Sequence, residues 1–106
     1  MNISGNLLSS IPSSLFLLDN LKLLDVSNNK LKALPEMVNH SICEFRASGN
    51  LIEALPNIEM DSLEVLDMKG NKIRELPACF GGLKGLRKVV LDDNLLSEIP
   101  GFFGNF

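Results

Sequence analysis

Residues 21–35 read LKLLDVSNNKLKALP, and the same arrangement recurs three times further along the chain. The later copies are ICEFRASGNLIEALP at residues 42–56, LEVLDMKGNKIRELP at 63–77 and LRKVVLDDNLLSEIP at 86–100. Residues 1–20 hold only the later part of such a block. A period of roughly 20–50 residues is typical of proteins built from stacked units of similar structure.

Two features keep the same phase through all the blocks. An asparagine recurs at spacings of 23, 21, 21 and 23 residues, and an aliphatic–Pro pair begins five residues after each one. The asparagines are Asn6, Asn29, Asn50, Asn71 and Asn94. The pairs are Ile11-Pro12, Leu34-Pro35, Leu55-Pro56, Leu76-Pro77 and Ile99-Pro100. The chain is therefore one repeat segment, residues 1–106, with blocks at 1–20 (partial), 21–41, 42–62, 63–85 and 86–106 (partial).

The first part of each block alternates in polarity, which indicates a short strand with one buried face. Leu24 and Val26 alternate with Leu23, Asp25 and Ser27. The equivalent apolar residues are Ile3, Phe45 and Ala47, Leu66 and Met68, and Val89 and Leu91. We expect parallel strands near residue 3 and at residues 24–26, 45–47, 66–68 and 89–91, joined by right-handed crossovers.

The repeated asparagine follows each strand, where the chain turns away from the sheet. A primary amide donates and accepts hydrogen bonds at once, so it can satisfy backbone groups that a buried turn leaves without partners. We expect the five phased asparagines to form a structural ladder that ties each block to the next. Asn57 is out of phase and is predicted to lie in a loop.

The proline of each block marks the start of a return on the far side, because it fixes φ and removes a backbone donor. The returns at residues 13–16 and 78–81 belong to the 23-residue periods and have room for a short helix. The returns at residues 35–38 and 56–59 belong to 21-residue blocks, and there we predict a turn or a 3₁₀ segment.

The shared pattern L-x-x-L-x-L-x-x-N-x-L-x-x-L-P resembles the leucine-rich repeat family, and the resemblance covers the whole chain. It implies an α/β fold, a curved right-handed solenoid with a parallel concave sheet and short helices, 3₁₀ turns and loops on the convex side. The Leu-Pro returns and the 21–23 residue period are similar to the intracellular, Ras-signalling-scaffold type. Neither end shows a polar capping block, so we expect the segment to be an excerpt of a longer array.

Composition argues against several functional classes. A net charge of −3 and a pI near 5.0 do not suit a sequence-independent nucleic-acid binder, which needs a clustered basic surface. No apolar run reaches the roughly 18 residues of a membrane span. Cys43 and Cys79 lie on opposite sides of the expected core, too far apart for a disulfide. Two free thiols favour a reducing compartment, and we therefore predict a cytoplasmic location.

The candidate catalytic, metal and nucleotide sites are weak. His40 and Cys43 lack the third, orienting group that a thiol nucleophile usually needs, and one histidine with two distant cysteines is no metal ligand set. Residues 81–85, GGLKG, lack the spacing of a phosphate-binding loop. The acidic pair Asp92-Asp93 is interpreted as a solvated face. We therefore expect no catalysis, no cofactor and no metal.

Two sequons for N-glycosylation, Asn2-Ile3-Ser4 and Asn39-His40-Ser41, are also present. Asparagine and serine are frequent in this chain, so about one such match is expected by chance. The sequons therefore carry little weight for an extracellular location.

The outward strand positions form columns across the blocks, and these columns are the candidate binding surface. Aliphatic residues stand among opposite charges, as protein-binding surfaces require, although single exposed aliphatics are also common on ordinary strands. The predicted partner-binding residues are Leu23, Asp25, Glu44, Arg46, Val65, Asp67, Lys69, Lys88, Val90 and Asp92. Ser27 belongs to the same outward set.

The pattern favours a protein–protein interaction module that binds a partner protein on its concave face and has no catalysis of its own. Neither nucleic acid nor membrane is an expected partner, and the uncapped terminal repeats would allow end-to-end self-association. Three alternatives stay open from the sequence. They are a docking or regulatory region of a larger kinase, phosphatase or ubiquitin ligase, a fragment of a receptor ectodomain, and a structural spacer.

Overall fold

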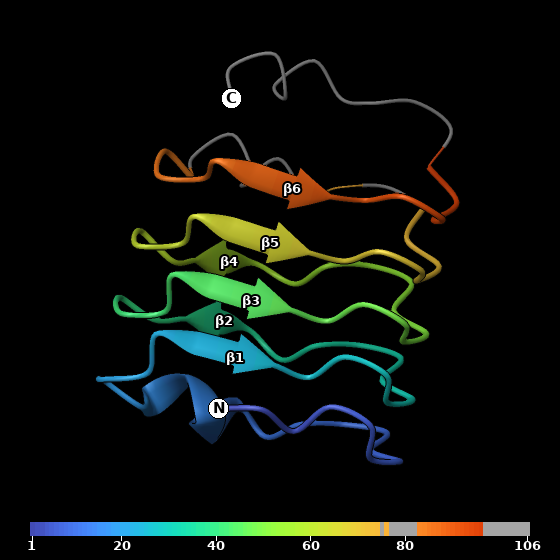
Figure 1. Cartoon of the computed structure of the whole chain (residues 1–106), viewed down its shortest axis with the longest axis horizontal. Coiled ribbons are helices and arrows are strands. Elements are labelled where there is room, and N and C mark those ends of the chain that lie inside the picture. Colours follow the sequence, from blue (N-terminus) through green and yellow to red (C-terminus); the bar gives the residue numbers. More distant parts are fainter. Residues whose placement is uncertain (75, 77–82, 97–106) are drawn as a thin grey trace.

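The computed structural model describes residues 1–74, 76 and 83–96, and it stacks the blocks as successive layers (Figure 1). One 3₁₀ helix, η1 (Ser13–Leu17), precedes the strands. The strands, in chain order, are β1 (Leu23–Asp25), β2 (Met37–Val38), β3 (Glu44–Arg46), β4 (Ile58–Glu59), β5 (Val65–Asp67) and β6 (Lys88–Val90).

The main sheet is parallel, with strand order β1-β3-β5-β6. Its register places Leu24 beside Phe45, Phe45 beside Leu66 and Leu66 beside Val89. The expected strands are thus confirmed with a shift of one residue. Near residue 3, a parallel bridge joins Asn2 to Asp25. The right-handed sense of the crossovers stays a prediction.

The core lies directly behind the main sheet. Leu24, Phe45 and Leu66 have no exposed surface, because the strand alternation turns them inward while their neighbours face out. The rings of Phe16 in η1 and Phe45 in β3 lie 6.0 Å apart at an interplanar angle of 52°. This contact joins the first return to the centre of the sheet.

The returns at residues 35–38 and 56–59 differ from the expected turn or 3₁₀ segment. They form a second parallel sheet of β2 and β4, which lies behind the main sheet in Figure 1. Two adjacent blocks of 21 residues bring equivalent extended segments into register, so the Met37 amide donates to the Asn57 carbonyl oxygen at 3.1 Å. Burial of Met37 and Ile58 against the core stabilises this arrangement.

The longer first return is helical, as its period predicts. η1 spans Ser13–Leu17, begins after Pro12 and buries Phe16. The equivalent helix expected at residues 78–81 lies outside the described residues, as do Cys79 and the Ile99-Pro100 pair.

The residue before each phased asparagine has a positive φ. These residues are Gly5, Asn28, Gly49, Gly70 and Asp93, with φ between 57° and 72°. Glycine adopts this left-handed conformation without strain, and asparagine and aspartate tolerate it better than other residues do. The sharp turn that ends each strand therefore has a local cause in the sequence.

Gly49→Ala should lower the free energy of unfolding by about 1–2 kcal/mol, because alanine is strained at positive φ. A Cβ at Gly49 would meet Oδ1 of the exposed Asn28 side chain, which can turn away, whereas a Cβ at Gly5 meets nothing within 4 Å. Gly5→Ala, at a similar φ of 72°, should therefore cost about the same. Urea unfolding of both variants measures the losses, and no loss in either variant would contradict the strain at positive φ.

Candidate functional site

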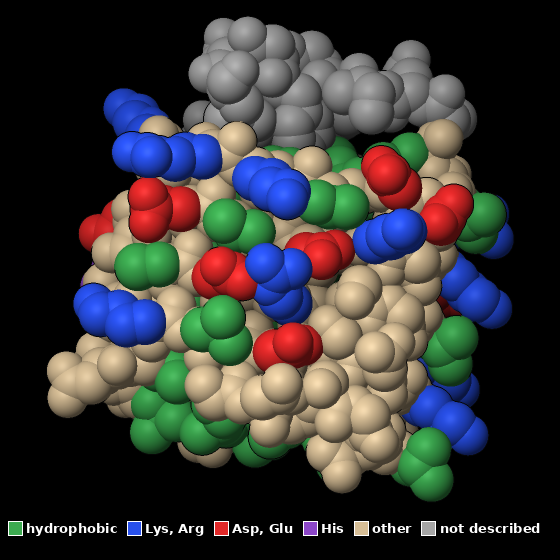
Figure 2. Space-filling model, in the orientation of Figure 1, with side chains coloured by type: hydrophobic (Ala, Val, Ile, Leu, Met, Phe, Trp, Pro, Cys, Tyr) green, Lys and Arg blue, Asp and Glu red, His purple; other side chains and the backbone are tan. Residues whose placement is uncertain are grey.

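The parallel register assembles the predicted outward residues into two columns on the main sheet. Leu23, Glu44, Val65 and Lys88 occupy one column. Asp25, Arg46, Asp67 and Val90 occupy the next. Figure 2 shows the result, a face on which aliphatic side chains alternate with carboxylates and cations. The columns expected from the sequence are therefore brought together as one surface.

Arg46 stands at the centre of this face and is held by carboxylates. Its Nε donates to Oε2 of Glu44 on the same strand, and its Nη1 lies 3.3 Å from Oδ2 of Asp67 on β5. The hydrogen bond to Glu44 raises the pKa of Arg46, burial opposes it, and the charges of Glu44, Asp67 and Asp25 raise it further. The guanidinium is thus a positive charge in a defined position.

The two aspartates beside Arg46 are themselves oriented by the backbone. Oδ1 of Asp25 accepts the Ser27 amide at 2.9 Å, and Oδ1 of Asp67 accepts the Lys69 amide at 3.1 Å. Each aspartate therefore closes a local turn at the end of its strand and keeps a fixed direction toward the face.

The predicted binding residues at the edges of the face make fewer interactions with one another than those around Arg46. Lys69, Lys88 and Asp92 are exposed, and none of them makes an ion pair within residues 1–74, 76 and 83–96. Ser27 does not face outward as expected: it is 6% exposed, and its hydroxyl accepts the Ser48 amide at 3.2 Å. The turn of the following block covers it, which the alternation within one block does not reveal.

The phased asparagines hydrogen-bond adjacent blocks together. Nδ2 of Asn50 donates to the carbonyl oxygens of Val26 at 3.1 Å and Ala47 at 3.0 Å. Its Oδ1 accepts the amides of Asn29 and Leu31, each at 3.2 Å. The Asn50 side chain therefore supplies hydrogen-bond partners to buried backbone groups in the block of residues 21–41, which the turn itself could not satisfy.

The same arrangement recurs at the other phased positions. Nδ2 of Asn71 donates to Ala47 and Met68, and its Oδ1 accepts the Ile52 amide at 3.2 Å. Asn94 repeats this one block later with 2.9 Å donor bonds to Met68 and Leu91. Asn29, Asn50 and Asn71 are buried, Asn94 is half-buried, and Asn6 is exposed and bonds the carbonyl of Ile3.

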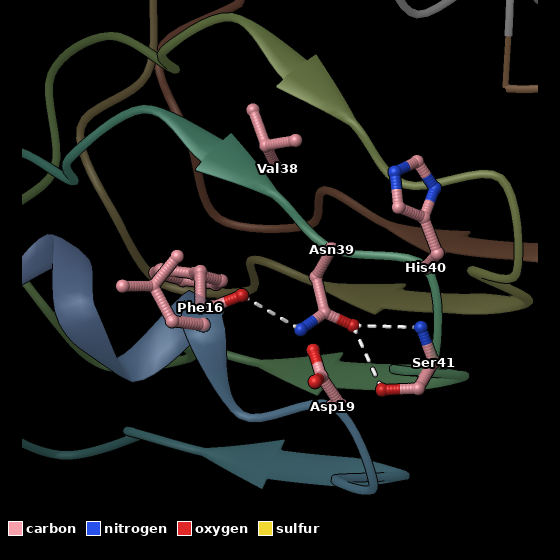
Figure 3. Close-up of a pocket in the computed structure, with 7 residues that line it drawn as sticks. Phe16, Asp19, Val38, Asn39, His40 and Ser41 are labelled. Atoms are coloured by element: carbon pink, nitrogen blue, oxygen red, sulfur yellow. Dashed lines mark hydrogen bonds between the residues drawn. The ribbon is translucent and has the colours of Figure 1, made fainter.

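Asn39 is a buried polar residue that the repeat pattern missed. It is 4% exposed, and its Nδ2 donates to the carbonyl oxygen of Phe16 at 2.8 Å (Figure 3). Its Oδ1 accepts the amides of Ser41 at 2.7 Å and Ile42 at 2.8 Å. An asparagine two residues before a serine is a signal for such a side-chain turn, although the same spacing also makes Asn39 part of a sequon.

The hydrogen bonds of Asn39 block its sequon in the folded chain. The nitrogen that would carry a glycan donates to the carbonyls of Phe16 and Leu18 and lies in the interior. Asn2, in contrast, is exposed, and its Oδ1 accepts the Ser4 hydroxyl. The two sequons therefore differ in accessibility.

His40 contacts Asp61 rather than Cys43. Its Nδ1 lies 2.9 Å from Oδ1 of Asp61, and this bond lowers the pKa of Asp61. Both side chains are more than 70% exposed. Sγ of the half-buried Cys43 lies 3.5 Å from the Ser41 carbonyl oxygen. The described residues thus place no thiol beside an imidazole base.

Neither a metal centre nor a membrane-spanning helix is present within residues 1–74, 76 and 83–96. No group of three histidine, cysteine, aspartate or glutamate side chains lies close enough to hold a metal ion. No helix there has the length and apolar character to cross a membrane.

Comparison with known proteins agrees with the stacked blocks and the asparagine ladder. A sequence model described as Leucine Rich Repeat matches residues 20–58 and 62–83, more than half of the chain. No curated protein matches the chain. The matched residues contain β1, β2, β3 and β5, together with Asn29, Asn50 and Asn71. The chain belongs to the leucine-rich repeat family.

Proposed function

We propose that the outward face of the main sheet binds another protein. Leucine-rich repeat domains generally mediate protein–protein interactions, and their repeats are typically non-catalytic. The observation that carries the proposal is the arrangement around Arg46, whose guanidinium is held by Glu44 and Asp67. Leu23 and Val65 lie beside Glu44, and Val90 lies beside Asp67. Apolar anchors beside ordered charges are what a specific interface needs.

Association on this face would use the two kinds of residue differently. Leu23, which is 36% exposed, and its aliphatic neighbours would lose contact with water, which supplies affinity. The charges would select the partner, because a mismatched charge buried in the interface is costly. Glu44 and Asp67 already hold Arg46 in place, so little side-chain entropy is lost on binding.

We further propose a cytoplasmic location and a role in a signalling scaffold. The free thiol of Cys43 supports a reducing compartment. The resemblance of the Leu-Pro returns to the Ras-signalling-scaffold type supports the scaffold role.

Arg46→Glu should weaken partner binding at least tenfold, about 1.4 kcal/mol, because it replaces the central cation with a fourth carboxylate. Lys84→Glu is the matched control, since it makes the same charge reversal on an exposed return residue. The partner would be captured from lysate with the unaltered chain and identified, and its affinity for each variant measured by calorimetry. Loss of binding with Lys84→Glu and retention with Arg46→Glu would place the interface elsewhere.

A further inference from the structure

A groove lies between η1 and β2. Figure 1 shows β2 behind the main sheet, away from its outward face, and Figure 3 shows residues that line the groove. It consists of a pocket of about 370 Å³ and an adjoining one of about 220 Å³, which share Phe16, Leu17 and Val38. Asp19 lines the first pocket and Glu36 lines the second. We call the two together the return groove.

The walls of the return groove expose apolar surface. η1 buries Phe16 against the core, and its neighbour Leu17 consequently points out and is 75% exposed. Val38 on β2 is 38% exposed, because Met37 takes the inward position of that strand. Exposed apolar groups that line a concave site are typical of a binding surface.

The two edges of β2 are both covered by neighbouring segments. The amides of Met37 and Asn39 donate toward β4, to the carbonyls of Asn57 and Glu59. On the other side β2 packs against η1, and the Asn39 side chain ties the two together through the carbonyls of Phe16 and Leu18. The groove therefore offers its exposed side chains to an occupant, and not a free strand edge.

Two carboxylates, Asp19 and Glu36, line the groove, and His40, which also lines it, contacts Asp61. Residues 12–21, 35–41 and 56–62 carry Asp19, Glu36, Glu59 and Asp61 and contain no lysine or arginine. The outward face of the main sheet, in contrast, carries cations as well as carboxylates. An apolar groove bordered by carboxylates is complementary to apolar groups that carry adjacent positive charge.

We propose that the return groove binds a short segment of a partner protein in which apolar side chains are flanked by lysine or arginine. The apolar side chains cover Leu17 and Val38, and the flanking cations face Asp19 and Glu36. This surface is separate from the Arg46 face, so it provides a second attachment point.

Three labelled hexapeptides test the chemistry by fluorescence anisotropy with the full chain: SRLVRS, SELVES and SRGGRS. SRLVRS should bind at least tenfold more tightly than either of the others, and its affinity should fall as salt is added, because surface charges are screened. Equal binding of SELVES or SRGGRS would overturn the proposal.

Matched variants locate the site of binding. Leu17→Ser and Asp19→Lys should each weaken SRLVRS at least tenfold. Leu7→Ser, at a leucine that is 80% exposed elsewhere, and Glu53→Lys should leave it unchanged. Circular dichroism verifies that each variant is folded. Retained binding in both groove variants, or loss only with Arg46→Glu, would overturn the proposal. A dimer of this chain that Leu17→Ser dissociates would assign the groove to a second copy and also overturn it.

Discussion

Asn50→Ala is expected to lower the free energy of unfolding by about 3 kcal/mol. The substitution leaves the buried amides of Asn29 and Leu31 without the acceptor that Oδ1 of Asn50 provides. The carbonyl oxygens of Val26 and Ala47 keep one donor each, from Asn29 and from Asn71. The loss therefore comes mainly from two orphaned N–H groups.

Urea unfolding followed by circular dichroism measures this effect. Asn71→Ala should cost about 2 kcal/mol, since its Oδ1 accepts one amide, that of Ile52. Asn57→Ala is the control, because Asn57 is exposed and out of phase, and it should change stability by less than about 0.5 kcal/mol. Equal, small shifts of the midpoint for all three variants would contradict the ladder.

The ladder also predicts that Asn50 and Asn71 are energetically coupled. The Ala47 carbonyl accepts from both amides, so it loses its last side-chain donor when both asparagines are replaced. The double variant should cost more than the sum of the single variants by at least about 0.5 kcal/mol. If the losses of the two single variants simply add, the Ala47 carbonyl oxygen does not need a donor from either asparagine, and the coupling is contradicted.

Asn39→Ala is expected to cost about 2–3 kcal/mol, although Asn39 lies outside the ladder. It removes the donor to the carbonyls of Phe16 and Leu18 and the acceptor for the amides of Ser41 and Ile42. Its partners lie in two different returns, so the substitution should also loosen η1 against β2.

Two measurements separate this local effect from a general loss of stability. Urea unfolding gives the overall change, with Asn57→Ala again as the control. Limited chymotrypsin digestion under native conditions should cleave Asn39→Ala near Phe16 and Leu17 faster than it cleaves Asn71→Ala. If both variants were cut there at the same rate, the role assigned to Asn39 in holding η1 would be wrong.

Features that every block needs could be predicted from the sequence. Leu24, Phe45 and Leu66 hold the same inward position in successive strands, and all three are buried. Each block packs against its neighbours in the same way, so the same position is buried every time. The phased asparagines follow the same logic, since every strand ends in a turn that buries backbone groups. A periodic requirement leaves a periodic signal, and such signals predicted the parallel main sheet and its columns.

Features that depend on a contact between two particular blocks were decided only by the tertiary structure. The strands β2 and β4 exist because two returns of equal length lie in register, and neither return signals this alone. Asn39 is buried because η1 presents the carbonyls of Phe16 and Leu18 to it, whereas Met60 takes the equivalent place one block later. The cause is physical: a hydrogen bond or a strand pairing has two partners, and the pattern within one block specifies only one of them.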